Sequence, residues 1–121
     1  MRKRLLSLLL LSLYGSMLFA QEPLDINDVE RVPLGDFTYQ WRNIYDRTPL
    51  HGKCRIILSY RSYTIAHFNK DGILDGLYEK YEDNHLVQKL TYVKGILRGK
   101  GYEYYTDGTV KKECVWNEQG R

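Results

Sequence analysis

The chain has 121 residues, the length of a single domain. It carries 18 Lys and Arg against 15 Asp and Glu, and the three surplus charges are Arg2, Lys3 and Arg4. The rest of the chain is therefore balanced in charge and lacks the clustered Lys and Arg of a nucleic-acid surface. The same balance gives no support to binding an acidic membrane by charge.

Residues 1–20 have the three parts of a secretory signal peptide. The basic start is followed by an apolar run from Leu5 to Leu13, and Ala20 is the small residue expected before a cleavage site. The apolar run, extended to Phe19, is shorter than the roughly 20 residues that a membrane-spanning helix needs. We expect export and cleavage near Ala20, which would leave a periplasmic or secreted protein.

Residues 21–48 form a lead-in to the main part of the chain. Phe37, Tyr39, Trp41 and Tyr45 share one parity, which predicts a capping strand with its aromatic side chains on one face. The preceding stretch, residues 25–32, fits either one helical turn or an extended approach to that strand.

From residue 49 onward the sequence repeats every 23 or 24 residues. One column of the repeat is the triplet Leu-x-Gly, which begins at Leu50, Leu74 and Leu97. A second column is aromatic and consists of Tyr45, Phe68, Tyr92 and Trp116. Two columns in one register define three copies, which are residues 49–73, 74–96 and 97–120.

Each copy is predicted to be a β-hairpin. Asp83-Asn84 and Asp107-Gly108 each lie between alternating segments, and Asp-Gly in particular favours a type I′ turn. Single hairpins are marginally stable in water, so neighbouring copies must stack. The sequence therefore predicts an all-β fold: an elongated antiparallel β-meander of about three hairpin repeats.

The segment Gly99-Lys100-Gly101-Tyr102-Glu103-Tyr104-Tyr105-Thr106-Asp107-Gly108 resembles the core of a MORN repeat. The looser spacing and the Leu-x-Gly triplet are closer to bacterial MORN-variant repeats, which include proteins described as YwqK-like antitoxins. The resemblance covers residues 45–116 and is weakest in the first copy. It implies a meandering sheet with a role in protein contacts or membrane association, and it implies no catalytic residues.

A search for chemistry finds no site. His51, His67 and His85 lack the spacing of metal ligands, and no nucleophile or nucleotide-binding motif is present. Cys54 and Cys114 lie on the second and seventh predicted strands, roughly 24 Å apart at ~4.8 Å per strand step. That distance favours two buried thiols over a disulfide, unless the sheet curls enough to meet itself.

Counting back from the turns places Leu77, Leu86, Leu90 and Trp116 on one apolar face. The opposite face is expected to carry a stripe of aromatic and basic side chains. Its predicted members are Tyr78, Tyr102, Tyr104, Lys80, Lys89 and Lys111. Tyrosines here either cover the stems of lysines or anchor a protein partner, and we take the stripe as the predicted partner surface.

These observations predict an exported, non-catalytic repeat scaffold that mediates protein–protein interaction in the cell envelope. It is expected not to be an enzyme and to need no cofactor. The alternative is an immunity or antitoxin-type protein that neutralises a toxin outside the cytoplasm. An enzyme acting on envelope polymers is a third class, for which the sequence offers no residues.

Export gives the first testable prediction. The mature protein should begin at or near Gln21, because the basic, apolar and small-residue parts occur in the required order. N-terminal sequencing of the protein from the envelope fraction checks this. An intact Met1 on a membrane-embedded chain would contradict it.

Overall fold

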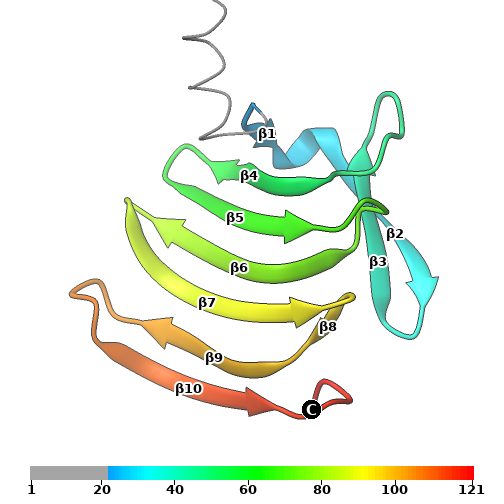
Figure 1. Cartoon of the computed structure of the whole chain (residues 1–121). Helices are drawn as coiled ribbons and strands as arrows, with labels where there is room; N and C mark the ends of the chain where they lie inside the picture. The colour runs from blue at the N-terminus through cyan, green and yellow to red at the C-terminus, as the bar shows by residue number, and fades with distance from the viewer. Residues whose placement is uncertain (1–21) are drawn as a thin grey trace, which may run out of the picture.

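The computed structural model describes residues 22–121, so the predicted signal peptide lies outside the described residues. The fold is all-β, and the described part contains no α-helix, only the 3-10 turn η1 (Ile26–Asp28) (Figure 1). The strands are β1 (Leu24–Asp25), β2 (Val29–Gly35), β3 (Thr38–Asn43), β4 (Gly52–Ser59), β5 (Ser62–Phe68), β6 (Leu74–Glu82), β7 (His85–Val93), β8 (Ile96–Leu97), β9 (Gly99–Tyr104) and β10 (Val110–Trp116).

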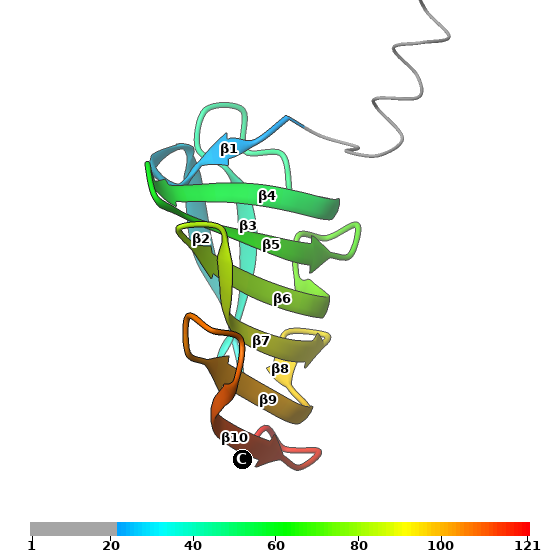
Figure 2. The same ribbon diagram turned by 90° about the vertical axis from the view of Figure 1, so that its left-hand side faces the viewer.

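The main sheet follows the chain. Its order is β1-β4-β5-β6-β7-β9-β10, with the short β8 paired to β7, and every pair from β4 onward is antiparallel. Strand β1 pairs with β4 in parallel, so the sheet is mixed at that edge. Figure 2 shows the strands from β4 to β10 as successive rungs of one curved ladder.

The two columns of the repeat meet across each hairpin. In each hairpin the glycine of the triplet lies directly opposite the aromatic residue of the second column. The three pairs are Gly52 with Phe68, Gly76 with Tyr92, and Gly99 with Trp116. In the last hairpin a Cβ on Gly101 would lie 2.4 Å from the Trp116 ring. The two columns of the sequence repeat are therefore residues paired across each hairpin. In the last hairpin the Trp116 ring also covers Gly101, a position without a side chain.

The turns differ in detail from the prediction. Asp83 and Asn84 both have positive φ and form the expected two-residue turn between Glu82 and His85. The predicted type I′ turn at Asp107-Gly108 is wrong, because only Gly108 has positive φ. The chain instead makes a longer loop in which the Tyr105 N–H donates to the Thr109 carbonyl at 2.9 Å.

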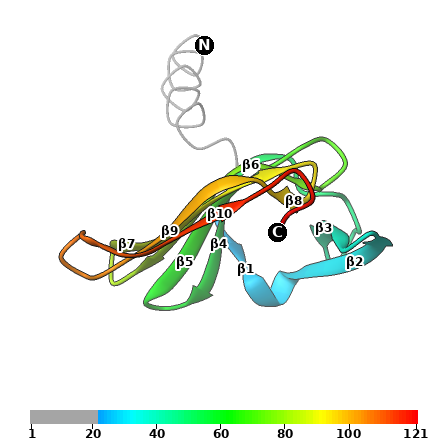
Figure 3. The same ribbon diagram turned by 90° about the horizontal axis from the view of Figure 1, so that it is seen from below.

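The lead-in folds back onto one face of the sheet, which we call the inner face. Strands β2 and β3 form a separate two-stranded hairpin that runs across the rungs of the main sheet. Figure 3 shows this hairpin on one side of the curved sheet, where β3 contacts β6 and its Trp41 contacts Phe68 on β5. The core lies between them and consists of Leu50, Cys54, Ile56, Thr64, Ala66, Phe68 and Leu74.

Trp41 on β3 attaches this hairpin to the sheet. Its N–H donates to the Gly72 carbonyl at 2.7 Å, and its carbonyl accepts from the Leu50 N–H at 3.0 Å. The Trp41 ring packs on Phe68 with the ring centres 5.5 Å apart. A Cβ on Gly72 would lie 2.5 Å from the Trp41 carbonyl oxygen, so this contact requires glycine.

The predicted place of Tyr45 in the aromatic column is wrong. Strand β3 ends at Asn43, and Tyr45 is 77% exposed in the following turn, where its hydroxyl donates to Asp28. Asn43 accepts from the N–H of Tyr45 through its side chain and so turns the chain out of the strand. Trp41 occupies the position next to Phe68 instead.

The two cysteines do not meet. Cys54 on β4 is buried as predicted, whereas Cys114 on β10 is only partly buried, so the prediction of two buried thiols is wrong for Cys114. Four strands separate β4 from β10 in the sheet. No helix within residues 22–121 has the length and apolar character to cross a bilayer.

The aromatic packing gives a stability prediction. Phe68→Ala should lower the free energy of unfolding by about 3–4 kcal/mol, because the ring is 4% exposed and packs on Trp41. Tyr45→Ala is the matched control and should cost about 1 kcal/mol or less, since only an exposed hydrogen bond is lost. Urea denaturation of both variants checks this, and equal losses would contradict the observed packing.

Candidate functional site

The six residues of the predicted partner stripe do not share one face, so that part of the prediction is wrong. Tyr78 lies opposite Leu90 and Lys80 opposite Gln88, which puts both on the inner face. The register between β6 and β7 shifts between Lys80 and Tyr81, because β7 contains one extra residue there. A bulge of one residue exchanges the two faces of the strand, and counting back from the turn misses it.

The other tyrosines of the predicted stripe lie on the outer face. Tyr102 is opposite Lys89, and its ring stacks on that of Tyr104 with the centres 6.0 Å apart. Lys111 lies at a second register shift in β10, with its ammonium nitrogen 5.9 Å from the centre of the Tyr105 ring. The outer part of the stripe is thus reduced to Tyr102, Tyr104 and Lys89, and its role as a partner surface stays a prediction.

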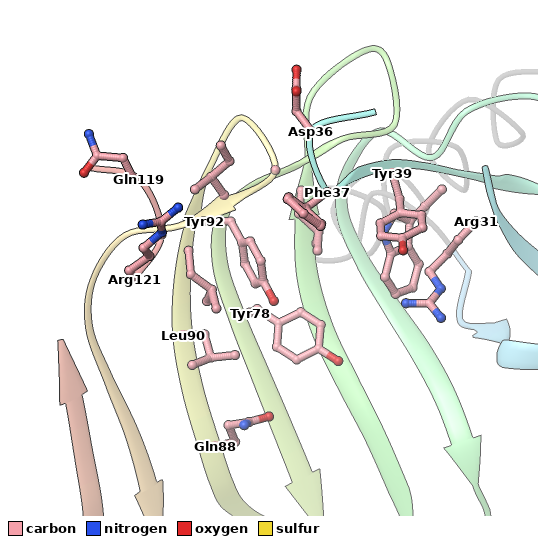
Figure 4. Close-up of a pocket in the computed structure, with 16 residues that line it drawn as sticks. Arg31, Asp36, Phe37, Tyr39, Tyr78, Gln88, Leu90, Tyr92, Gln119 and Arg121 are labelled. Carbon is pink, nitrogen blue, oxygen red and sulfur yellow. The ribbon is translucent and has the colours of Figure 1, made fainter. Parts of the chain in front are cut away.

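A larger feature lies on the inner face, where the β2–β3 hairpin stops short of β9 and β10. It is a cleft of about 620 Å³, shown in Figure 4. Its floor is made by Tyr78, Leu90 and Tyr92, and its walls by the hairpin on one side and residues 95–97 and 119–121 on the other. We call it the hairpin cleft. Its size is that of an ordinary ligand pocket.

The tip of the hairpin forms the mouth of the cleft. The turn consists of Asp36 and Phe37, which have φ of 53° and 65°. Aromatic residues rarely adopt this region, which normally takes glycine or asparagine, and the conformation costs on the order of 1–2 kcal/mol. The Phe37 ring is 97% exposed, so no burial within residues 22–121 offsets that cost.

Arg31 lies on the wall formed by the hairpin. Its guanidinium carbon is 5.3 Å from the centre of the Tyr39 ring and 5.5 Å from that of Trp41. These cation–π contacts hold the side chain along the aromatic wall. The structure of residues 22–121 gives Arg31 neither an ion pair nor a hydrogen bond.

The floor of the cleft is a pair of tyrosines. The rings of Tyr78 and Tyr92 meet edge to face with their centres 5.9 Å apart. Burial raises the pKa of Tyr78, while a hydrogen bond from Thr64 and the charge of Arg31 offset part of that rise. Burial also raises the pKa of Tyr92, and the neighbouring Tyr78 adds to the rise. Both hydroxyls are therefore neutral at physiological pH.

Three cleft residues, Phe37, Tyr39 and Trp41, were recognised in the sequence as a strand and not as a site. The alternate spacing of Tyr39 and Trp41 was the available signal for these two, which lie on β3. The predicted place of Phe37 in the same strand is wrong, because it lies in the turn before β3 with positive φ. Arg31 carried no such signal, because its contact with Trp41 depends on the register of β2 against β3. Among residues 22–121, no three His, Cys, Asp or Glu side chains come together as a metal site.

The buried tyrosines predict a pH dependence. A tyrosine whose folded pKa is raised contributes stability that is full below its unfolded value near 10 and is lost as pH rises through the folded pKa. Stability should therefore fall above about pH 10. The double variant Tyr78→Phe, Tyr92→Phe should lose less stability between pH 8 and pH 11 than the parent protein. Urea denaturation at both pH values measures this, and an unchanged loss would contradict it.

Comparison with known proteins gives a distant likeness in structure alone. No family model matches the chain, and no curated protein is similar to it in sequence. Solved structures with a similar arrangement include a crystal structure of TarM, with 15% identity and a TM-score of 0.42 over 77% of this chain. Another is a mutant of S. aureus TarM in complex with Fondaparinux, alpha-GlcNAc-glycerol and UDP, with 15% identity and a TM-score of 0.39 over 71% of this chain. This chain spans 18% and 16% of those two chains.

The prediction that this chain is not an enzyme does not stand, because the solved structures with a similar arrangement are of TarM, a glycosyltransferase. At TM-scores of 0.42 and 0.39 the likeness carries no argument on what reaction, if any, this chain performs.

Proposed function

We propose that the protein is an exported, MORN-like repeat scaffold that binds another protein in the cell envelope, with the hairpin cleft as the binding site. The proposal rests on the exposure and the backbone conformation of Phe37. A large apolar ring stands almost fully exposed on a turn whose backbone conformation disfavours it. Strained residues of this kind cluster at binding sites, because the strain is retained where a contact needs that geometry.

The surroundings of Phe37 favour a protein as the partner. Tyr39, Trp41, Tyr78 and Tyr92 line the cleft below it. Aromatic side chains are enriched in protein interfaces, because they offer a large contact area with few rotatable bonds. Binding energy in such interfaces concentrates in a few buried aromatic and arginine anchors. Phe37 has the most area to bury and is the expected main anchor.

The outer pair Tyr102 and Tyr104 is the competing surface. These two rings already stack on each other and are partly buried, so they have less area left to offer a partner. Their backbone lies in the regular strand β9, without the strain found at Phe37. We therefore rank the hairpin cleft ahead of the outer pair.

Site-specific photo-crosslinking tests the proposal. A benzophenone amino acid placed at position 37, and in separate strains at positions 102 and 60, is activated in intact cells that make the protein. We expect one discrete crosslinked product from position 37 and none from position 60. Tyr60 is the matched control, since it is 91% exposed on the β4–β5 turn, away from the cleft.

The unlabelled variant Phe37→Ala should weaken complex formation at least tenfold, as truncation of an anchor residue does. It should leave the thermal midpoint unchanged within a few degrees, because the ring is solvent-exposed. A product from position 102 alone would assign binding to the outer face instead. The absence of a product from all three positions would overturn the proposed function.

A further inference from the structure

The hairpin cleft contains polar groups whose bonding capacity is unused. Arg31 has a planar guanidinium held by Tyr39 and Trp41 but no carboxylate opposite it within residues 22–121. The side-chain amide of Gln88 lines the same cleft and forms no hydrogen bond in that part of the chain either. The other arginine of the hairpin, Arg42, is paired with Glu30 at 2.6 Å. Of the two arginines in the hairpin, Arg31 is therefore the one that two rings hold in place and that has no ion-pair partner among residues 22–121.

The chemistry of Arg31 selects an anionic ligand group. A guanidinium offers a rigid fork of N–H donors, which matches the two oxygens of a carboxylate. Stacking on the two rings lowers the entropy that the side chain loses when it receives a ligand. The floor next to it is apolar and carries no carboxylate, since it consists of Tyr78, Leu90 and Tyr92. A ligand that contacts both Arg31 and the floor of the cleft must therefore combine an anionic group with apolar groups.

The shape of the inner face favours an extended ligand. A second hollow of about 210 Å³ lies toward β10 and shares Gln88, Leu90 and Leu97 with the cleft. Its far side is formed by Trp116 and Gly101. A chain that crosses β7 can place side chains in both hollows. A single small molecule held at Arg31 would leave the second one unfilled.

We propose that the hairpin cleft binds an extended segment of the partner polypeptide in which an acidic side chain lies next to apolar or aromatic ones. Arg31 receives the carboxylate, the neighbouring apolar side chains lie on Leu90 and Tyr92, and the Gln88 amide bonds the ligand main chain. This inference rests on the proposed function and adds the chemical class of the segment that the partner presents.

Two synthetic peptides test it. The probe is the acetylated, amidated hexapeptide Ser-Leu-Glu-Phe-Leu-Ser, and its matched control has Gln in place of Glu. Binding is followed by the NMR shift of the Trp41 indole N–H during titration. The Glu peptide should bind about tenfold more tightly than the Gln peptide, as expected for a charge-assisted hydrogen bond. Added salt should weaken the binding of the Glu peptide alone.

Variants assign the preference to Arg31. Arg31→Gln should make the two peptides bind equally, while Arg31→Lys should retain part of the preference, because a lysine keeps the charge and loses the planar fork. Arg47→Gln is the control, since Arg47 is an exposed arginine on the turn after β3. It should behave as the parent protein does. Unchanged near-UV circular dichroism shows that each variant is folded.

Three results would overturn the inference. They are equal binding of the two peptides to the parent protein, a preference that survives in Arg31→Gln, and no indole shift with the Glu peptide at millimolar concentration. A larger response to trigalacturonic acid than to the Glu peptide would reassign the site to acidic sugars. If these tests fail while position 37 still crosslinks a protein, the proposed function stands and only the ligand chemistry is wrong.

Discussion

The arrangement of this protein depends on the attachment of one main-chain position, Trp41, to the main sheet. Its N–H and carbonyl bond to Gly72 and to Leu50, and its ring covers Phe68. Buried main-chain groups must be paired, so these bonds fix both the height and the angle of the hairpin. That angle sets the position of the rest of the β2–β3 hairpin. It places Phe37 at the mouth of the cleft and Arg31, which is exposed, against Tyr39 and Trp41 on the cleft wall.

The repeat explains why a cleft exists at all. Each hairpin pairs an aromatic residue with a glycine across two neighbouring strands, and this pairing does not need the lead-in hairpin. The lead-in hairpin covers the first of these rings, where the core residues lie. It does not reach the later ones, so Tyr92 and Trp116 line hollows and are not part of the buried core. Because the lead-in hairpin is shorter than the main sheet, the inner face is buried near β4 and β5 and open near β9 and β10.

The features that the sequence predicted correctly are local ones. The glycine of the Leu-x-Gly triplet and the aromatic residue lie 16 or 17 residues apart within each hairpin, and they are directly paired in the structure. What failed depends on single-residue shifts or on distant contacts. The bulge at Val87 of β7 leaves both faces of the strand with a mixed composition, so no pattern of polarity reveals it. Tyr45 and Trp41 share parity and aromatic character. Only Asn43 and Asp46, residues that favour turns, indicated that the strand ended before Tyr45.

The long loop that the Trp41 contact closes has a consequence for how the protein folds and opens. The hairpins of the main sheet pair residues close in sequence, and such contacts form quickly. Docking of the lead-in joins Gln40 to Asp71 and Trp41 to Gly72, across a separation of 31 residues. The entropy of closing that loop has to be met before the docked contacts stabilise anything. We therefore expect the cleft to be the last part to assemble and the lead-in hairpin to be the part that opens first. The cleft in which we propose that a partner binds exists only while the lead-in hairpin is docked on the sheet.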